Sequence, residues 1–154
     1  MNIWVINGPN LNLLGRREPA LYGSETYDDL LGFIYDAAAR EGVHVECYQS
    51  NYEGALVDLI QNALGKADGI IINAAAYTHT SIAILDALKA VALPAVEVHL
   101  TDISAREPFR AISYPAMACI GQIKGKGFEG YAEAIRLLKE NATPMDGLAP
   151  GKQP

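Results

Sequence analysis

The chain has 154 residues, 50% of them hydrophobic, and this length fits one domain with a full core rather than two. Its formal net charge of -6 disfavours nucleic acids and anionic membranes as partners, because both require a basic surface. The first residues lack a basic start and a long apolar run, so we expect no signal peptide, no membrane span and a cytoplasmic protein. The spacing of its two cysteines and three histidines predicts neither a disulfide framework nor a metal site.

Short apolar runs that are typical of buried strands alternate along the chain with stretches of helical spacing. Strand-like runs occupy residues 3–6, 43–48, 69–73, 95–99 and 116–120, and helical spacing occupies residues 27–38, 56–64, 82–91 and 131–138. Such a series predicts an α/β fold, a flavodoxin-like parallel sheet of five strands in the order 2-1-3-4-5 with helices on both faces. We expect residues 1–142 to form a single α/β domain. Residues 143–154 hold three prolines and two glycines without an apolar period, which predicts a disordered tail.

Local signals also bear on the helix ends and on the cysteines. Ser50 to Glu53 resembles a capping box and predicts the start of the second helix. Gly42 and Gly65 fit the ends of the first two helices, because glycine readily adopts the left-handed conformation that closes a helix. Both cysteines lie in predicted strands, where a buried free thiol behaves as a small hydrophobe.

Polar residues stand at the carboxyl ends of three predicted strands. Asn7 ends the first strand and leads to Asn10, Asn73 ends the third, and Glu97 and His99 end the fourth. In an open α/β sheet, ligands bind outside the carboxyl ends of the strands, near the point where strand order reverses. One polar strand end is usually turn chemistry, but three on the same edge predict a binding site.

Glu97 and His99 are two residues apart on a predicted strand, so their side chains leave the same face of the sheet. A carboxylate that holds one imidazole nitrogen fixes the tautomer of the ring and raises the basicity of the other nitrogen. The pair therefore predicts a histidine suited to proton donation. The alternative is a structural ion pair at a strand end.

Arginines are concentrated in two predicted loops of this acidic chain. Four of the six arginines lie there: Arg16, Arg17, Arg106 and Arg110. This concentration predicts capture of a small anion, a carboxylate or a phosphate, although solubility is the alternative explanation. Tyr22 follows five residues after Arg17, and its phenol could act as a base only if a nearby cation lowers its pKa. Arg17 is the candidate for that cation.

His79 and Asp86 flank the start of the third predicted helix. Hydroxyl residues near this start are favoured caps, whereas imidazole is an indifferent cap, so His79 either binds a ligand or caps the helix. Asp86 lies about 10 Å further along the helix axis, so the two side chains cannot easily touch one small ligand. Because this helix is apolar over a broad arc, we expect another subunit to cover it and Asp86 to complete the neighbour's site. The alternative is an ordinary exposed aspartate.

The residues described above belong to a longer series of motifs in fixed order. These motifs occupy residues 7–15, 17–19, 22–23, 49–51, 53–54, 73, 77–81, 86–87, 97–100, 105–107 and 109–110. With this series, the chain closely resembles the type II 3-dehydroquinate dehydratases, flavodoxin-like enzymes of the shikimate and quinate pathways. The resemblance covers Met1 to about Lys139, and several runs in fixed order are far more specific than any one motif.

The resemblance implies dehydration of 3-dehydroquinate to 3-dehydroshikimate by anti elimination through an enolate, with no metal or organic cofactor. It implies that Tyr22 is the base that takes the proton next to the ketone, and that Arg17 stabilises its phenolate. Asn10 would help to stabilise the enolate, in this interpretation through a bound water. His99, held by Glu97, would protonate the departing hydroxyl.

The resemblance also implies a binding set and an assembly. In the binding set, the residues that contact the substrate would be Asn73, His79, Leu100, Thr101 and Arg110. Asp86 matches a residue that an adjacent subunit supplies, and the family commonly forms a homododecamer built from trimers.

The sequence departs from the family pattern at three places. Thr101-Asp102 stands where the family usually has Ser-Asn, and Asp102 adds a negative charge near the expected substrate carboxylate. Leu85 replaces a usual arginine, which removes an ion pair from the expected subunit contact. Ala74-Ala75 replaces a common Pro-Gly pair.

Two other functions stay open at this point. A flavodoxin-like module could bind FMN, a nucleotide or phosphate through the first loop. That loop lacks the hydroxyls and glycines that cradle a phosphate, and such a site leaves Tyr22 and the Glu97 and His99 pair unexplained. A non-catalytic relative could serve as a structural subunit, an alternative that Asp102 and Leu85 motivate.

Overall fold

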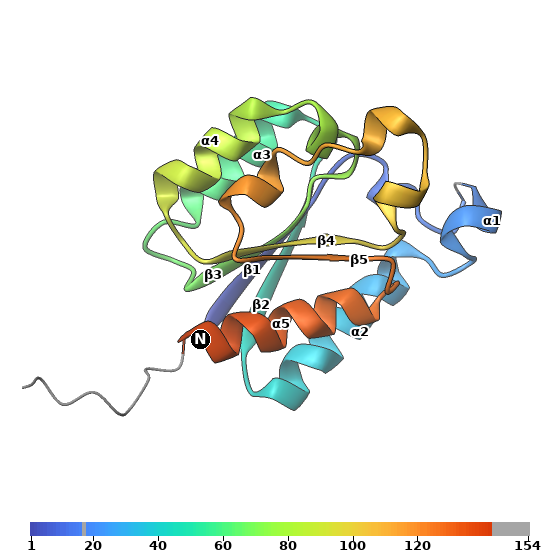
Figure 1. Cartoon of the computed structure of the whole chain (residues 1–154). Coiled ribbons are helices and arrows are strands. Elements are labelled where there is room, and N and C mark those ends of the chain that lie inside the picture. The colour runs from blue at the N-terminus through green and yellow to red at the C-terminus, as the bar shows by residue number, and fades with distance from the viewer. Residues whose placement is uncertain (17, 143–154) are drawn as a thin grey trace, which may run out of the picture.

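Five parallel strands form one sheet at the centre of the molecule (Figure 1). The computed structural model describes residues 1–16 and 18–142, apart from the side chain of Tyr22, and the predicted tail at 143–154 lies outside the described residues. The strands are β1 (Asn2–Asn7), β2 (His44–Gln49), β3 (Gly69–Asn73), β4 (Ala95–His99) and β5 (Gly121–Lys124). Their order is β2-β1-β3-β4-β5, which confirms the predicted topology.

Helices cover both faces of this sheet. The α-helices of the described residues are α1 (Pro19–Tyr22), α2 (Tyr27–Glu41), α3 (Glu53–Asn62), α4 (Ile82–Val91) and α5 (Glu129–Ala142). Helices α2 and α5 pack on one face, and α3 and α4 pack on the other (Figure 1). Successive strand residues point to opposite faces, so Ile3 and Val5 of β1 join the first core layer while Trp4 and Ile6 join the second. None of the described helices is long and apolar enough to cross a membrane.

The prediction of a fifth strand at residues 116–120 is wrong. This run forms the 3-10 helix η5 (Pro115–Ala118) and the turn after it, and the strand begins only at Gly121. Proline has no N–H and favours the first position of a helical turn, and a short apolar run alone does not distinguish such a turn from a strand. Helix η5 packs against α4 instead of pairing with β4. Cys119 therefore lies outside a strand, whereas Cys47 lies in β2 as predicted.

The predicted capping box at the second long helix is also wrong. Helix α3 has Tyr52 as its N-cap residue, and the Ser50 hydroxyl accepts a hydrogen bond from the Tyr52 N–H at 3.1 Å. A capping box is present instead at α2, where Thr26 and Asp29 each accept a hydrogen bond from the other's backbone N–H, at 3.1 and 2.8 Å. The carboxylate of Asp29 thereby supports the start of α2.

Left-handed backbone conformations occur both at glycines and at one alanine beside the sheet edge. Gly42 closes α2 with a φ of 68°, as predicted. Gly65 has a φ of 75° but lies beyond Ala63, the residue that caps the end of α3. Ala75 lies two residues after the end of β3 and has a φ of 51°, a conformation in which the alanine Cβ is strained. The alanine at position 75, where the family commonly has glycine, therefore strains the backbone.

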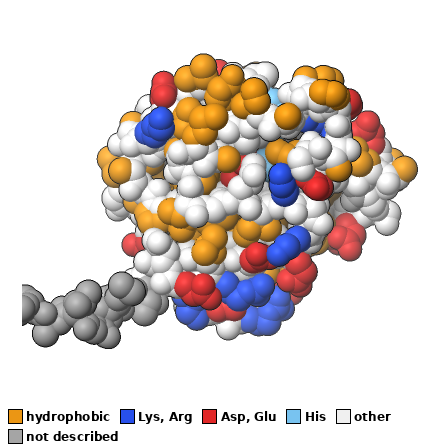
Figure 2. All heavy atoms as spheres, viewed as in Figure 1, with side chains coloured by type: hydrophobic (Ala, Val, Ile, Leu, Met, Phe, Trp, Pro, Cys, Tyr) orange, Lys and Arg blue, Asp and Glu red, His pale blue; other side chains and the backbone are white. Residues whose placement is uncertain are grey.

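Much of the apolar surface of α4 is covered within the chain. Its residues Ile84, Leu88 and Val91 belong to the core, α3 packs against the helix, and η5 packs against it as well. Helix η5 thus supplies part of the cover that we expected from another subunit. Figure 2 shows hydrophobic side chains gathered over the part of the surface that α4 and the short helices after β4 form. The exposed large hydrophobic residues of these segments are Ile82, Phe109, Ile112, Met117 and Ile120.

Ala75→Gly should stabilise the protein. The left-handed conformation costs a non-glycine residue about 1–2 kcal/mol, whereas the extra freedom of glycine in the unfolded chain costs about 0.5–1 kcal/mol. We therefore expect the free energy of unfolding, measured with denaturant, to rise by about 0.5–1 kcal/mol. Ala111→Gly is the matched control, because Ala111 is exposed with a φ of -71° and should lose stability. An Ala75→Gly variant that is no more stable than the wild type would contradict the strain at this residue.

Candidate active site

A hollow opens at the carboxyl ends of β3 and β4. This is the edge of the sheet where the sequence predicts a ligand. Its lining residues are Leu11, Asn73, Ala75, Ala76, His79, His99, Leu100, Thr101, Ile103, Arg106 and Arg110. Six predicted site residues therefore lie around one hollow: Asn73, His79, His99, Leu100, Thr101 and Arg110.

Glu97 lies behind the hollow, and its carboxylate is fully enclosed with 0% exposure. The Thr78 hydroxyl donates to Oε1 at 2.9 Å, and the Gln122 amide donates to Oε2 at 2.7 Å. The Ser113 hydroxyl lies 2.8 Å from both carboxylate oxygens. Ser113 also accepts a hydrogen bond from the Ala116 N–H, so its own proton is directed to the carboxylate. Glu97 thus accepts a hydrogen bond from each of Thr78, Ser113 and Gln122.

The hydrogen bonds around Glu97 favour its ionised form. Burial raises the pKa of this carboxyl group, but the contact with His99 and the hydrogen bonds from Ser113 and Gln122 outweigh burial. The resulting pKa lies below the ordinary value of 4.5. Glu97 therefore carries a negative charge at neutral pH although it has no contact with solvent.

His99 faces this charge, as the spacing of the two residues predicts. Its Nε2 atom lies 3.0 Å from Oε1 of Glu97, and its side chain is only 5% exposed. The contact is not aligned with the ring N–H, so Nε2 has no linear hydrogen-bond partner among the described residues. The contact is an electrostatic pair that holds one edge of the ring, while the ring borders the hollow. His99 is consequently a candidate for proton transfer to a ligand.

His79 belongs to the 3-10 helix η2 (Ala75–His79) and does not cap the helix that follows it. The cap of α4 is Ser81, whose hydroxyl accepts a hydrogen bond from the Ile84 N–H at 3.0 Å. The Nδ1 atom of His79 lies 2.8 Å from the carbonyl oxygen of Ile112. Because a carbonyl only accepts, Nδ1 carries a proton and the other ring nitrogen is available to a ligand. This geometry favours the ligand-binding interpretation of His79.

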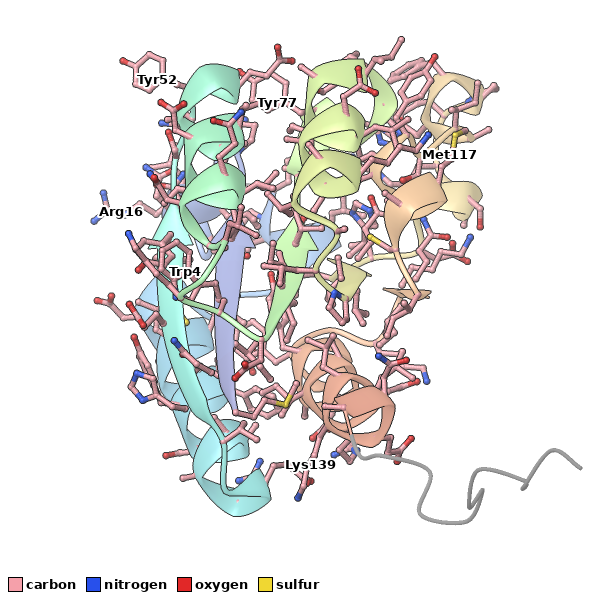
Figure 3. All side chains as sticks on the ribbon, turned by 90° about the vertical axis from the view of Figure 1, so that its left-hand side faces the viewer. Trp4, Arg16, Tyr52, Tyr77, Met117 and Lys139 are labelled. Atoms are coloured by element: carbon pink, nitrogen blue, oxygen red, sulfur yellow. The ribbon has the colours of Figure 1, made fainter. Side chains whose placement is uncertain are left out.

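The four loop arginines do not gather at one place. Arg106 and Arg110 line the hollow, and Nε of Arg110 forms a 2.7 Å ion pair with Glu107. Arg16 borders a different hollow beside the start of α2 and points away from the body of the molecule (Figure 3). Arg17 lies outside the described residues. Of the described loop arginines, Arg106 and Arg110 therefore lie at the hollow, each within 4 Å of Glu107, and Arg16 does not.

Two other predicted site residues, Asn10 and Asp86, do not line the hollow, and the side chain of a third, Tyr22, is not described. Asn10 is exposed, and its backbone N–H donates to the side chain of Asn51 at 3.0 Å; its neighbour Leu11 lines the hollow instead. Asp86 is exposed on α4 and does not line the hollow of its own chain. The backbone of Tyr22 belongs to α1, but its side chain lies outside the described residues.

The carboxylate of Asp102 contacts Ser104 of its own loop. Its Oδ1 atom accepts a hydrogen bond from the Ser104 N–H at 3.0 Å and also contacts the Ser104 hydroxyl. Lys124 Nζ lies 3.9 Å from the same oxygen. The hydrogen bonds from Ser104 and the charge of Lys124 lower the pKa of Asp102, so it stays ionised but compensated. Asp102 does not line the hollow, whereas its neighbours Thr101 and Ile103 do.

Sequence reasoning did not identify the partners of Glu97. Thr78, Ser113 and Gln122 lie far from Glu97 in the chain, and only the sheet register brings Gln122 opposite Glu97. A strand placed at 121–124 would have revealed this pairing, because it puts Gln122 beside the fourth strand. Arg106 was recognised as a loop arginine but not as part of the binding set. No group of three His, Cys, Asp or Glu side chains that could hold a metal occurs in the part of the chain that is described.

Comparisons with known proteins identify the family of the chain. A family model described as Dehydroquinase class II matches residues 1–139. The 3-dehydroquinate dehydratase of Clostridium acetobutylicum is 53% identical over 139 residues, covering 90% of this chain and 96% of the relative. That of Geotalea daltonii is 56% identical over 138 residues with the same two coverages of 90% and 96%. The crystal structure of type II dehydroquinase from Butyrivibrio crossotus has a TM-score of 0.88 and 50% identity, covering 90% of this chain and 97% of that one. The chain therefore belongs to the class II dehydroquinase family.

Proposed function

We propose that this enzyme dehydrates 3-dehydroquinate to 3-dehydroshikimate, as a hydro-lyase of the shikimate or quinate pathway. The observation that carries the proposal is the enclosed, ionised Glu97 beside His99, at the edge of a hollow that two arginines line. A buried carboxylate can hold and orient the imidazole that it faces, and guanidinium groups suit a substrate with a carboxylate. The relatives named above carry the name of this activity.

The first proposed step removes a proton from the carbon next to the ketone. The phenolate of Tyr22 takes that proton, and the electron pair moves into the carbonyl to give an enolate. Arg17 stabilises the phenolate, since a neighbouring cation lowers the pKa of a phenol. Asn10 helps to stabilise the enolate oxygen through a bound water. These roles rest on the match of Tyr22, Arg17 and Asn10 to the family motifs.

The second proposed step expels the hydroxyl group of the substrate as water. The enolate electron pair returns to form the new carbon–carbon double bond while the carbon–oxygen bond breaks. His99 gives its proton to the departing hydroxyl, and Glu97 compensates the charge of the ring before that transfer. The base and the acid act on opposite faces of the substrate in an anti elimination. No metal or organic cofactor takes part in this scheme.

Different residues around the hollow bind different groups of the substrate. Thr101 offers a hydroxyl and Leu100 its backbone beside it, which suits the substrate carboxylate, while Asn73, His79 and Arg110 suit its hydroxyl and carboxylate oxygens. Asn73 ends β3, Leu100 and Thr101 directly follow β4, and His79 lies on η2. These positions support the proposal, because such elements hold side chains more precisely than long loops do. The cytoplasmic location stays a prediction.

We further propose that the chain acts as a homododecamer built from trimers, in which Asp86 reaches the hollow of an adjacent subunit. Asp86 is exposed on α4 and lies outside the hollow of its own chain. Ile82 on the same helix and Met117 on η5 are exposed hydrophobic residues at the surface where α4 meets η5. Burial of such side chains against a second copy would favour association.

Purified enzyme should convert 3-dehydroquinate to an enone in the presence of a metal chelator. The product contains a conjugated carbon–carbon double bond, so its ultraviolet absorbance reports the reaction directly. Turnover without added metal or cofactor is the expected result. Absence of product at micromolar enzyme would contradict the proposed function, and flavin absorbance of the purified protein would favour a flavin-binding module instead.

Tyr22→Phe should abolish most of the turnover while the fold and substrate binding persist. Loss of a general base typically costs about 100-fold or more in rate. The measurement is kcat together with the affinity for the product. Tyr52→Phe is the matched control, because Tyr52 is 77% exposed and should keep normal activity. Near-normal turnover of Tyr22→Phe would remove Tyr22 from the mechanism.

Mixed oligomers of Asp86→Ala and Tyr22→Phe subunits should regain activity that neither variant has alone. When both are unfolded together and refolded, about a quarter of the shared sites pair an intact Tyr22 with an intact Asp86 from the adjacent chain. If both residues served one site from the same chain, every mixed site would keep one lesion. Sedimentation must show that each variant assembles. Assembled mixtures no more active than their parents would contradict a shared site.

A further inference from the structure

Tyr131 of α5 connects two strand ends from beneath the sheet. Its side chain is 0% exposed and belongs to the core layer between the sheet and the helices α2 and α5. Its hydroxyl donates to Oδ1 of Asn7 at 2.7 Å and accepts a hydrogen bond from Nδ2 of Asn73 at 3.1 Å. Asn7 and Asn73 are register partners at the carboxyl ends of β1 and β3. One phenol therefore binds the last residues of two central strands.

A backbone amide fixes the direction of these hydrogen bonds. The N–H of Ala75 can only donate, and it donates to the side chain of Asn73 at 3.2 Å, so that atom is Oδ1. Nδ2 of Asn73 consequently faces Tyr131, whose hydroxyl must accept there. The single hydroxyl proton is then left for Asn7, which presents Oδ1. Each amide orientation follows from the previous one.

The same direction decides what Asn73 offers to a ligand. Asn73 lines the hollow, and its Nδ2 group has two protons, of which Tyr131 accepts one. The second proton can be donated to a ligand oxygen, whereas a rotated amide would present an acceptor. Burial raises the pKa of Tyr131, so the hydroxyl keeps its proton throughout the working pH range.

We propose that Tyr131 is a positioning residue that fixes the Asn73 amide, so that the hollow presents an N–H donor to a hydroxyl or carbonyl oxygen of the substrate. The inference rests on the proposed function, in which Asn73 contacts 3-dehydroquinate. Tyr131 acts through Asn73 and touches no ligand itself. Its effect therefore falls on binding rather than on the proton transfers at the reacting atoms.

Tyr131→Phe tests this role, because the substitution removes only the hydroxyl. Asn73 then loses the acceptor that orients it, and we expect KM and the dissociation constant of 3-dehydroshikimate to rise about fivefold to tenfold, with kcat changed less than twofold. Tyr27→Phe is the matched control: its hydroxyl lies 3.5 Å from Nδ2 of Asn7 and has no hydrogen bond to Asn73. That variant should keep the wild-type KM.

The same substitution in an Asn73→Ala enzyme separates a positioning role of Tyr131 from general destabilisation of the protein. In an Asn73→Ala enzyme, Tyr131→Phe should add no further increase in KM or in the product dissociation constant. If Tyr131→Phe does not fold, Asn7→Leu is used in its place. Without Asn7 as its acceptor, the Tyr131 hydroxyl can donate its proton to the Asn73 side chain, and it then no longer orients the Asn73 amide as an acceptor. An unchanged KM in the folded variant, or an equal increase in the Asn73→Ala background, would overturn the inference. Wild-type turnover tests the proposed function separately, and product affinity tests the inference even in an enzyme without turnover.

Discussion

The enclosed charge of Glu97 is the constraint on which the arrangement of the site depends. A carboxylate without solvent costs several kcal/mol unless hydrogen bonds replace the lost water. Here the replacement comes from separate segments: Thr78 before α4, Ser113 between the short helices after β4, and Gln122 on β5. Each segment must reach its place before the charge is satisfied, so the chemistry of the site and the closure of this side of the fold are coupled. His99 completes the arrangement from the side of the hollow.

A second buried polar centre lies on the other side of the same strand ends. Tyr131 satisfies Asn7 and Asn73 beneath the sheet, while Glu97 orders the surroundings of His99 one strand further along. The Tyr131 centre joins the last residues of β1 and β3 to the first turn of α5, and Glu97 lies on β4 two residues before its end. The apolar residues of β1 supply the rigidity, because they pack into both core layers at once. The polar centres therefore position the site, and the apolar layers hold them in place.

The sequence was sufficient for the features that depend on short repeats in the chain. Alternation of strands and helices predicted the sheet order, and the spacing of Glu97 and His99 predicted their contact. It was insufficient where distant segments meet or where short apolar runs have two possible structures. The misplaced fifth strand hid the pairing of Gln122 with Glu97, and Pro115 was the signal that could have corrected it. Tyr131 is 124 residues from Asn7, a separation that no local pattern bridges. The roles given to individual site residues stay predictions, since they concern a bound substrate.

The protonation state of Glu97 in the free enzyme tests the central claim most directly. A protonated carboxyl group has a carbonyl stretch in the infrared that an ionised carboxylate lacks, and the difference between wild type and Glu97→Gln isolates the band of this one residue. Because the pKa of Glu97 lies below 4.5, the account predicts no protonated band at neutral pH and its appearance only below that value. A protonated Glu97 band at neutral pH, absent from Glu97→Gln, would contradict the claim that an ionised carboxylate holds His99.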